Sequence, residues 1–169
     1  MDLLKIATEW ARAEVFSTRF FILFALLFLA ASVGFWQLGK SEIARAYIIP
    51  TLVAGGLLLI IGVGLFFTNK ARITQFEKAF YEDSSSFART EMTRAEGTLR
   101  EYQTVFKVIP CIIIVAALLI LFVPTPIWRA AAISTIAMMI VILLIDGTAH
   151  GRMEVYHQQL QAIIEPEED

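Results

Sequence analysis

The chain has 169 residues, of which 57% are apolar and 18% charged, and its mean hydropathy is +0.68. Soluble domains are typically about 45–50% apolar and about 25% charged, so the composition excludes an ordinary soluble protein and predicts an integral membrane protein. The single cysteine, Cys111, excludes a disulfide within the chain, and a net charge of −2 leaves no positive field for a nucleic-acid backbone.

The first predicted element is an amphipathic helix over residues 1–18. Leu3, Ile6, Trp10 and Ala13 form one apolar stripe, and charged residues lie opposite it. A helix of this kind either lies on the membrane surface or docks on other helices of the chain. The sequence leaves both alternatives open.

Four apolar segments that contain almost no charge are predicted to be transmembrane helices. A spanning helix needs about 20 apolar residues, and we place the four spans at residues 20–38, 46–68, 108–127 and 128–146. The proline-rich sequence Pro124-Thr125-Pro126 predicts a tight turn between the third and fourth spans.

Residues 69–107 are predicted to form a helical hairpin that extends spans 2 and 3 out of the membrane as a stalk. Their apolar residues keep helical spacing on both arms, and Asp83-Ser84-Ser85-Ser86 between the arms favours a turn and a helix cap. Residues 147–169 continue the fourth span as a helix and end in an acidic tail. The residues expected at the interface of the stalk helices are Ile73, Phe76, Phe80, Met92, Leu99, Tyr102, Phe106, Met153, Tyr156 and Leu160.

The basic residues predict the orientation of the chain. Most of them precede the first span, lie between the second and third, or follow the fourth, whereas the other side holds only Lys40, Arg45 and Arg129. By the positive-inside rule, both termini and the stalk lie in the cytoplasm, and we expect a bacterial inner membrane. The predicted fold is therefore an all-α membrane protein with a single four-span domain over residues 1–169.

Lys107 and Asp146 are the clearest ionisable residues at membrane depth. In a hairpin of spans 3 and 4 they lie within about a turn of the same level, so an ion pair is possible. Charged residues inside a membrane often mark functional sites. Both residues, however, lie at span ends where their side chains reach the polar interface, which favours a structural role.

A candidate metal site lies just beyond the fourth span. His150, Glu154 and His157 are spaced so that they share one face of a helix, and Glu-x-x-His is a motif of di-iron helix bundles. The chain has only 2 histidines, too few for a complete di-iron site in one subunit. A solvated helix face is the alternative that we prefer.

The contrast between plain apolar spans and a patterned stalk favours a non-enzymatic protein without a cofactor. We expect it to act through its stalk as an oligomeric scaffold, accessory or regulatory subunit. Its expected partners are the lipid bilayer and either copies of itself or another membrane protein. Two alternatives stay open, a homo-oligomeric ion channel gated by the stalk and a metal-dependent membrane enzyme that uses the histidine face.

Overall fold

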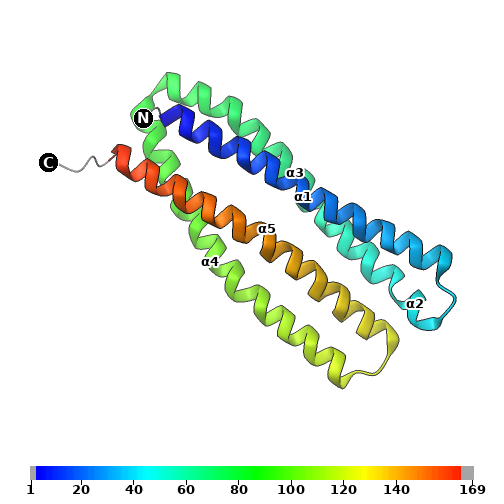
Figure 1. The fold of residues 1–169 in the computed structure, drawn as a ribbon. Helices are drawn as coiled ribbons and strands as arrows, with labels where there is room; N and C mark the ends of the chain where they lie inside the picture. The colour runs from blue at the N-terminus through cyan, green and yellow to red at the C-terminus, as the bar shows by residue number, and fades with distance from the viewer. Residues whose placement is uncertain (1–2, 165–169) are drawn as a thin grey trace.

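The structure, a computed structural model, describes residues 3–164 and is built from α-helices (Figure 1). The helices are α1 (Leu3–Leu38), α2 (Glu42–Ala46), α3 (Ile48–Glu82), α4 (Ser84–Phe122) and α5 (Pro126–Ile164). Four of them are long and apolar enough to cross a membrane, which confirms the four spans at the level of length and composition. The predicted acidic tail, residues 165–169, lies outside the described residues.

The long helices run without interruption from the apolar spans into the polar segments. From Leu3 onward, the predicted N-terminal helix and the first span are one helix, α1, and the predicted stalk helices are parts of α3, α4 and α5. The structure therefore corrects the predicted boundary between the first two elements. No Gly or Pro breaks α1 where the break was placed, since its first glycine is Gly34.

The connections between helices differ from the predicted ones, since α4 ends at Phe122 rather than at residue 127. Asp83 alone separates α3 from α4, and its carboxylate accepts hydrogen bonds from the backbone N–H groups of Ser85 (3.0 Å) and Ser86 (3.1 Å). These bonds, with that from the Ser85 hydroxyl, lower the pKa of Asp83. The turn between the last two spans covers residues 123–125, because α5 begins at Pro126, where a missing N–H costs least.

The start of the second span, after the connection between α1 and α3, also differs from the predicted one. The second span was predicted to start at residue 46, but α3 begins at Ile48 and is preceded by the short helix α2. Ser41 caps α2, since its hydroxyl accepts a hydrogen bond from the N–H of Ala44 at 3.2 Å.

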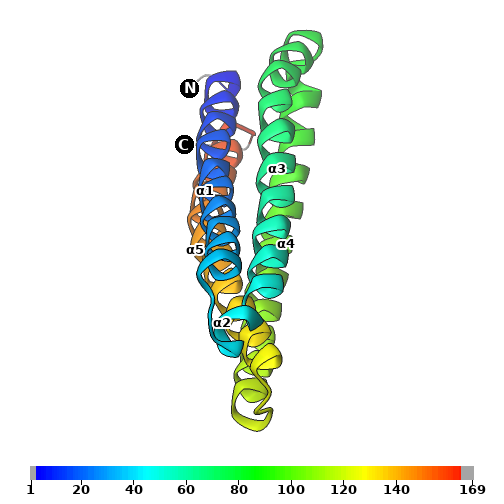
Figure 2. The same cartoon turned by 90° about the vertical axis from the view of Figure 1, so that its right-hand side faces the viewer.

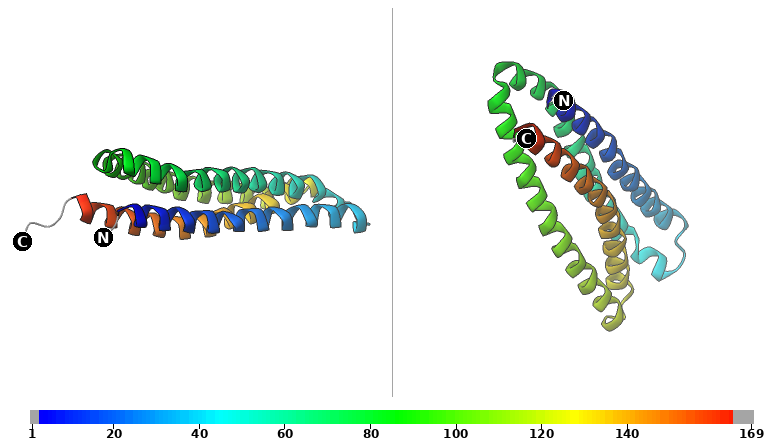
Figure 3. Two further views of the ribbon diagram at one scale, coloured as in Figure 1. Left: turned by 90° about the horizontal axis from the view of Figure 1, so that it is seen from above. Right: turned by 60° about the vertical axis from the view of Figure 1, so that its left-hand side comes forward.

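The long helices form two layers. Figure 2 shows α1 and α5 in one layer and α3 and α4 in the other, and the left view of Figure 3 shows the same division from above. The first turn of α1, the turn between α3 and α4 and the last turn of α5 lie at one end, which we call the stalk end. The connections 39–47 and 123–125 lie at the other end.

Two separate apolar cores stabilise these layers. The stalk core is made by all four long helices, and its buried members are Leu3, Ile6, Ala7, Trp10, Ala11, Phe76, Phe87, Ala88, Ala95, Met153, Tyr156 and Leu160. The span core is made by α1, α3 and α5, and its buried members are Phe21, Ala25, Ala54, Leu58, Met138, Val141 and Ile145. The N-terminal helix thus docks on the stalk, which decides between the two alternatives left open by the sequence.

The apolar spans are poorly covered by the rest of the chain. In the most apolar 18-residue window of each long helix, only 11–33% of the residues are buried, and α4 has the lowest value. Such a surface is too apolar to face water. It fits a membrane protein whose spans meet lipid or another protein.

Helices α1 and α3 approach each other closely at two glycines of α3. A Cβ atom at Gly62 would lie 2.8 Å from the Cβ of Phe21 and 3.1 Å from the backbone nitrogen of Ile22. A Cβ atom at Gly55 would be similarly close to α1, whereas a Cβ atom at Gly56 or Gly64 would have no neighbour within 4 Å. Small residues are therefore required only on the face of α3 that meets α1.

We predict that Gly62→Ala lowers the stability of the protein, because the added methyl group forces α1 and α3 apart. Overpacking of this kind costs about 1–3 kcal/mol. Gly64→Ala is the matched control, and it is expected to be neutral or to stabilise the helix by up to about 1 kcal/mol. Thermal unfolding in detergent or nanodiscs measures both variants. Equal unfolding midpoints for the two variants would contradict the close approach.

Candidate functional site

A buried polar cluster lies inside the stalk core. The Glu91 carboxylate on α4 is only 4% exposed and accepts two hydrogen bonds from the Arg94 Nε–H, at 2.9 and 3.0 Å. The Tyr156 hydroxyl on α5 donates to Glu91 Oε2 at 2.8 Å. A buried charge of this kind is tolerated only when it is paired and hydrogen-bonded, and Glu91 meets both conditions.

Trp10 of α1 covers this cluster. Its ring stacks on that of Tyr156 with centroids 5.1 Å apart, and the Arg94 guanidinium lies 4.3 Å from the Trp10 ring centroid. Stacking and cation–π contacts of this geometry are attractive. We call Trp10, Glu91, Arg94 and Tyr156 the clamp, because these residues tie α1, α4 and α5 together.

The electrostatics keep Tyr156 and Arg94 protonated, as hydrogen-bond donors to Glu91. Burial and the adjacent Glu91 charge raise the pKa of the Tyr156 hydroxyl, so it remains a protonated donor. Burial lowers the pKa of Arg94, but its hydrogen bonds and charge pairing with Glu91 outweigh this effect and raise it overall.

A second polar contact joins α1 and α5 closer to the spans. The Arg152 Nε–H donates to Glu14 Oε1 at 2.9 Å, and Glu14 is buried. On α3, the Arg72 guanidinium donates to Asn69 Oδ1 at 2.9 Å. These residues bring further charge into the interior between the stalk core and the span core.

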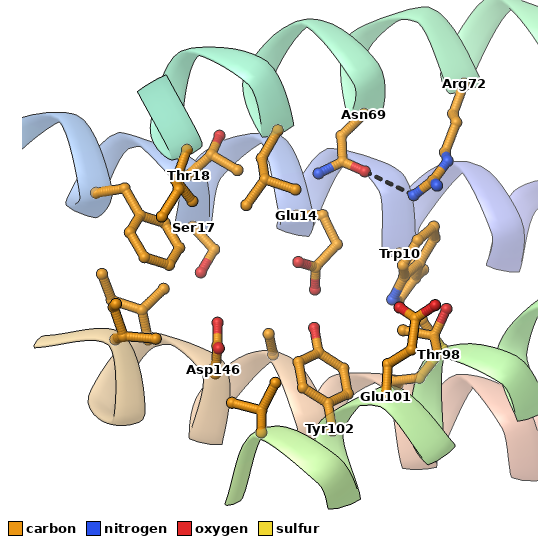
Figure 4. A pocket seen from close by; sticks show the side chains of 18 residues that line it. Trp10, Glu14, Ser17, Thr18, Asn69, Arg72, Thr98, Glu101, Tyr102 and Asp146 are labelled. Carbon is orange, nitrogen blue, oxygen red and sulfur yellow. Dashed lines mark hydrogen bonds between the residues drawn. The ribbon is translucent and has the colours of Figure 1, made fainter. Parts of the chain in front are cut away.

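A cavity of about 320 Å³ lies between the two cores and is enclosed by all four long helices (Figure 4). Its polar lining is Glu14, Ser17, Thr18, Asn69, Arg72, Thr98, Glu101, Tyr102 and Asp146, and its apolar lining includes Trp10, Phe21, Ile61, Leu65, Ile142 and Met153. This volume is at the lower end of the range found for small-molecule pockets, about 300–1,000 Å³.

Three polar side chains converge in the cavity. Figure 4 shows Glu14 and Asp146 pointing into it from opposite walls, with the Tyr102 hydroxyl beside them. Burial, followed by the charges of Glu14 and Asp146, raises the pKa of Tyr102, so this phenol remains a neutral donor. The cavity can therefore bind a ligand through hydrogen bonds and charge.

The predicted stalk interface residues are found inside the bundle. Phe76, Met153, Tyr156 and Leu160 are buried in the stalk core, and Ile73, Phe80, Met92, Leu99 and Tyr102 pack against it. Phe106 stacks on Tyr102, with centroids 6.2 Å apart. These stripes face other helices of the same chain, so they are not free to bind a partner.

The structure keeps Lys107 and Asp146 apart. Asp146 lines the cavity between the cores, whereas Lys107 lines an apolar groove of about 630 Å³ between α4 and α5. Within residues 3–164 the two form no ion pair. The two side chains therefore line different cavities.

The candidate metal residues do not assemble into a metal site. His150 Nε2 lies 3.8 Å from Glu154 Oε1. The His150 ring packs edge-on against the rings of Tyr102 and Phe106, with centroids 5.6 and 5.3 Å apart. In the described part of the chain, no group of three or more His, Cys, Asp or Glu side chains is placed to hold a metal ion. His150 is held here by aromatic packing.

Sequence reasoning missed Glu14 and Glu91, although both leave a signal. Glu91 lies four residues after Phe87 and four before Ala95, and Glu14 lies four residues after Trp10, so each falls on a buried helical stripe. A charged residue at an inward position indicates a buried partner. The partners themselves, Tyr156 and Arg152, are far away in the sequence.

Comparison with known proteins gives no relative from which a function can be transferred. No protein-family model, no curated protein and no solved structure matches the chain significantly.

We predict that Arg94→Met destabilises the protein by about 3–5 kcal/mol, because it leaves the buried Glu91 carboxylate without its counter-charge. Arg100→Met, two turns further along α4, is the matched control. Its ion pair with Glu96 is exposed and long, at 3.9 Å, and such pairs contribute about 0–1 kcal/mol. Thermal or denaturant unfolding of the two variants distinguishes them, and similar losses would contradict a clamp role for Arg94.

Proposed function

We propose that the chain is a non-enzymatic integral membrane protein that acts as a scaffold, accessory or regulatory subunit through a cytoplasmic stalk. The observation that carries this proposal is the construction of the stalk. Four uninterrupted helices pack around one apolar core with a buried ionic clamp, while the spans are largely uncovered. A rigid extension of this kind is suited to presenting a surface to another protein.

The tip of the stalk is the surface that we propose for the contact. The rings of Phe76, Phe80 and Phe87 pack edge-to-face beneath the turn between α3 and α4, with centroids 5.6–5.9 Å apart. Above them Tyr81 is 79% exposed. Exposed aromatic residues on a rigid support are enriched in protein interfaces. The partner is either a second copy of the chain or another membrane protein.

Ser32 and Thr51, two polar residues of the spans, give no support to the channel alternative. The Ser32 hydroxyl donates to the Ile48 carbonyl at 2.8 Å, and the Thr51 hydroxyl donates to the Tyr47 carbonyl at 2.7 Å. These groups are satisfied by backbone. The metal-enzyme alternative lacks the clustered ligands that it needs within residues 3–164. We therefore favour the subunit role.

The proposed orientation predicts which ends of the helices face the cytoplasm. In a Cys111→Ala background, a cysteine at Lys40 should react with a membrane-impermeant maleimide in intact spheroplasts. A cysteine at Ser85 should react only after permeabilisation, because it lies beside the turn at the stalk end. The reverse labelling pattern would contradict the orientation.

A photo-crosslinking experiment tests the role of the stalk tip. Benzoylphenylalanine in place of Tyr81 is expected to give a discrete protein adduct in native membranes, because the residue lies at the proposed contact. The control position is Ile60, a 71% exposed residue in the span of α3, where lipid adducts should dominate. The adduct mass distinguishes a second copy from another protein, and no protein adduct from position 81 would refute the proposal.

A further inference from the structure

The cavity between the two cores has an unequal distribution of charge. On one side Asp146 makes no hydrogen bond or ion pair with any described residue, while Glu14 opposite it is paired with Arg152. On the side nearer the stalk core lie Trp10, Asn69 and the oppositely charged Arg72 and Glu101, and Figure 4 shows these two ends separated along the cavity. The Asp146 end thus carries an uncompensated negative charge.

An unsatisfied donor marks the other end. Trp10 is only 7% exposed, and its indole Nε1–H is buried without a hydrogen-bond partner among residues 3–164. A buried polar group without a partner is costly and rare. Together with the unpartnered Asp146, it indicates that a molecule with polar groups at both ends completes the cavity.

The dimensions of the cavity limit the size of such a molecule. Trp10 and Ser17 both line the cavity and are seven residues apart on α1, which corresponds to about 10 Å along the helix. Between the Asp146 end and the Trp10 end, the wall formed by α5 is apolar, with Ala149 and Met153, while Glu14 and Tyr102 face it from α1 and α4. The ligand must therefore have a short apolar middle section.

We propose that this cavity binds a small organic cation, with its ammonium group between Asp146 and Glu14 and a hydrogen-bond acceptor at the Trp10 indole N–H. The Tyr102 hydroxyl beside the two carboxylates is a further hydrogen-bonding group for the bound molecule. This site goes beyond the proposed partner contact and is independent of it, since the stalk tip and the cavity share no residue.

The first arm of the test measures binding of a defined probe. Trp36→Phe and Trp128→Phe replace the two exposed tryptophans, so that Trp10 is the only indole and its fluorescence reports on the cavity. The probe is 6-aminohexanamide, which has an ammonium group and an amide carbonyl at opposite ends. Hexanamide is the control, because it lacks the charge. We expect a saturable fluorescence change with the cation and at least a tenfold weaker response to hexanamide.

The second arm uses variants of the cavity. Asp146→Asn removes the charge with little change in shape and should weaken binding about tenfold or more, as expected for a hydrogen bond to a charged group. Glu154→Gln, at an exposed position of the same helix, is the matched control and should leave the affinity unchanged.

A third variant keeps the test decisive if Asp146→Asn folds poorly. Ile142→Phe narrows the cavity without altering a charge and should also weaken binding at least tenfold, while the unfolding midpoint reports whether the fold is intact. Equal binding of hexanamide and the cation, unchanged affinity in a folded Asp146→Asn or Ile142→Phe variant, or no saturable change in the parent would each overturn the proposal.

Discussion

The arrangement of the stalk depends on the burial of the Glu91 carboxylate. Glu91 is 4% exposed, so its carboxylate loses its hydration and needs cationic and hydrogen-bonding groups in place of the water. Arg94 and Tyr156 supply these groups, and Trp10 covers them with its ring. Because Tyr156 and Trp10 come from α5 and α1, sliding either helix by one turn would remove the hydroxyl donor or the covering ring from the buried Glu91–Arg94 pair. The clamp therefore contributes to the register of the bundle more than to its net stability.

This register extends beyond the stalk because the helices do not end there. Each long helix passes from the stalk core into a candidate span without a break, so fixing its position at the clamp also fixes where its apolar part begins. The close approach of α1 to Gly55 and Gly62 then sets the distance between two of the spans. Helix α4 lacks such a contact with the span core, and its span is the least covered of the four.

The sequence predicts the helices well, because hydropathy and helical periodicity are local properties. It does not predict which side chains of different helices contact each other. The stripe of Leu3, Ile6 and Trp10 looks the same whether it meets lipid or protein, and only the fold shows that it docks on the stalk. Lys107 and Asp146 were predicted to lie at one level, but a level does not specify the rotation of a helix about its axis, and the two residues line different cavities. Glu91 and Tyr156, 65 positions apart, are paired only by tertiary structure.

The position of the cavity follows from the same geometry. Along α1 the inward stripe passes from Trp10 through Glu14 and Ser17 to Phe21, so this stripe is polar between its stalk-core and span-core members. Apolar side chains on either side interdigitate and draw the helices together, whereas the carboxylates of Glu14 and Asp146 repel each other and resist closure. The packed stalk core and span core on either side then hold the cavity open between them. A pocket supported in this way is preorganised, which lowers the cost of binding a ligand there.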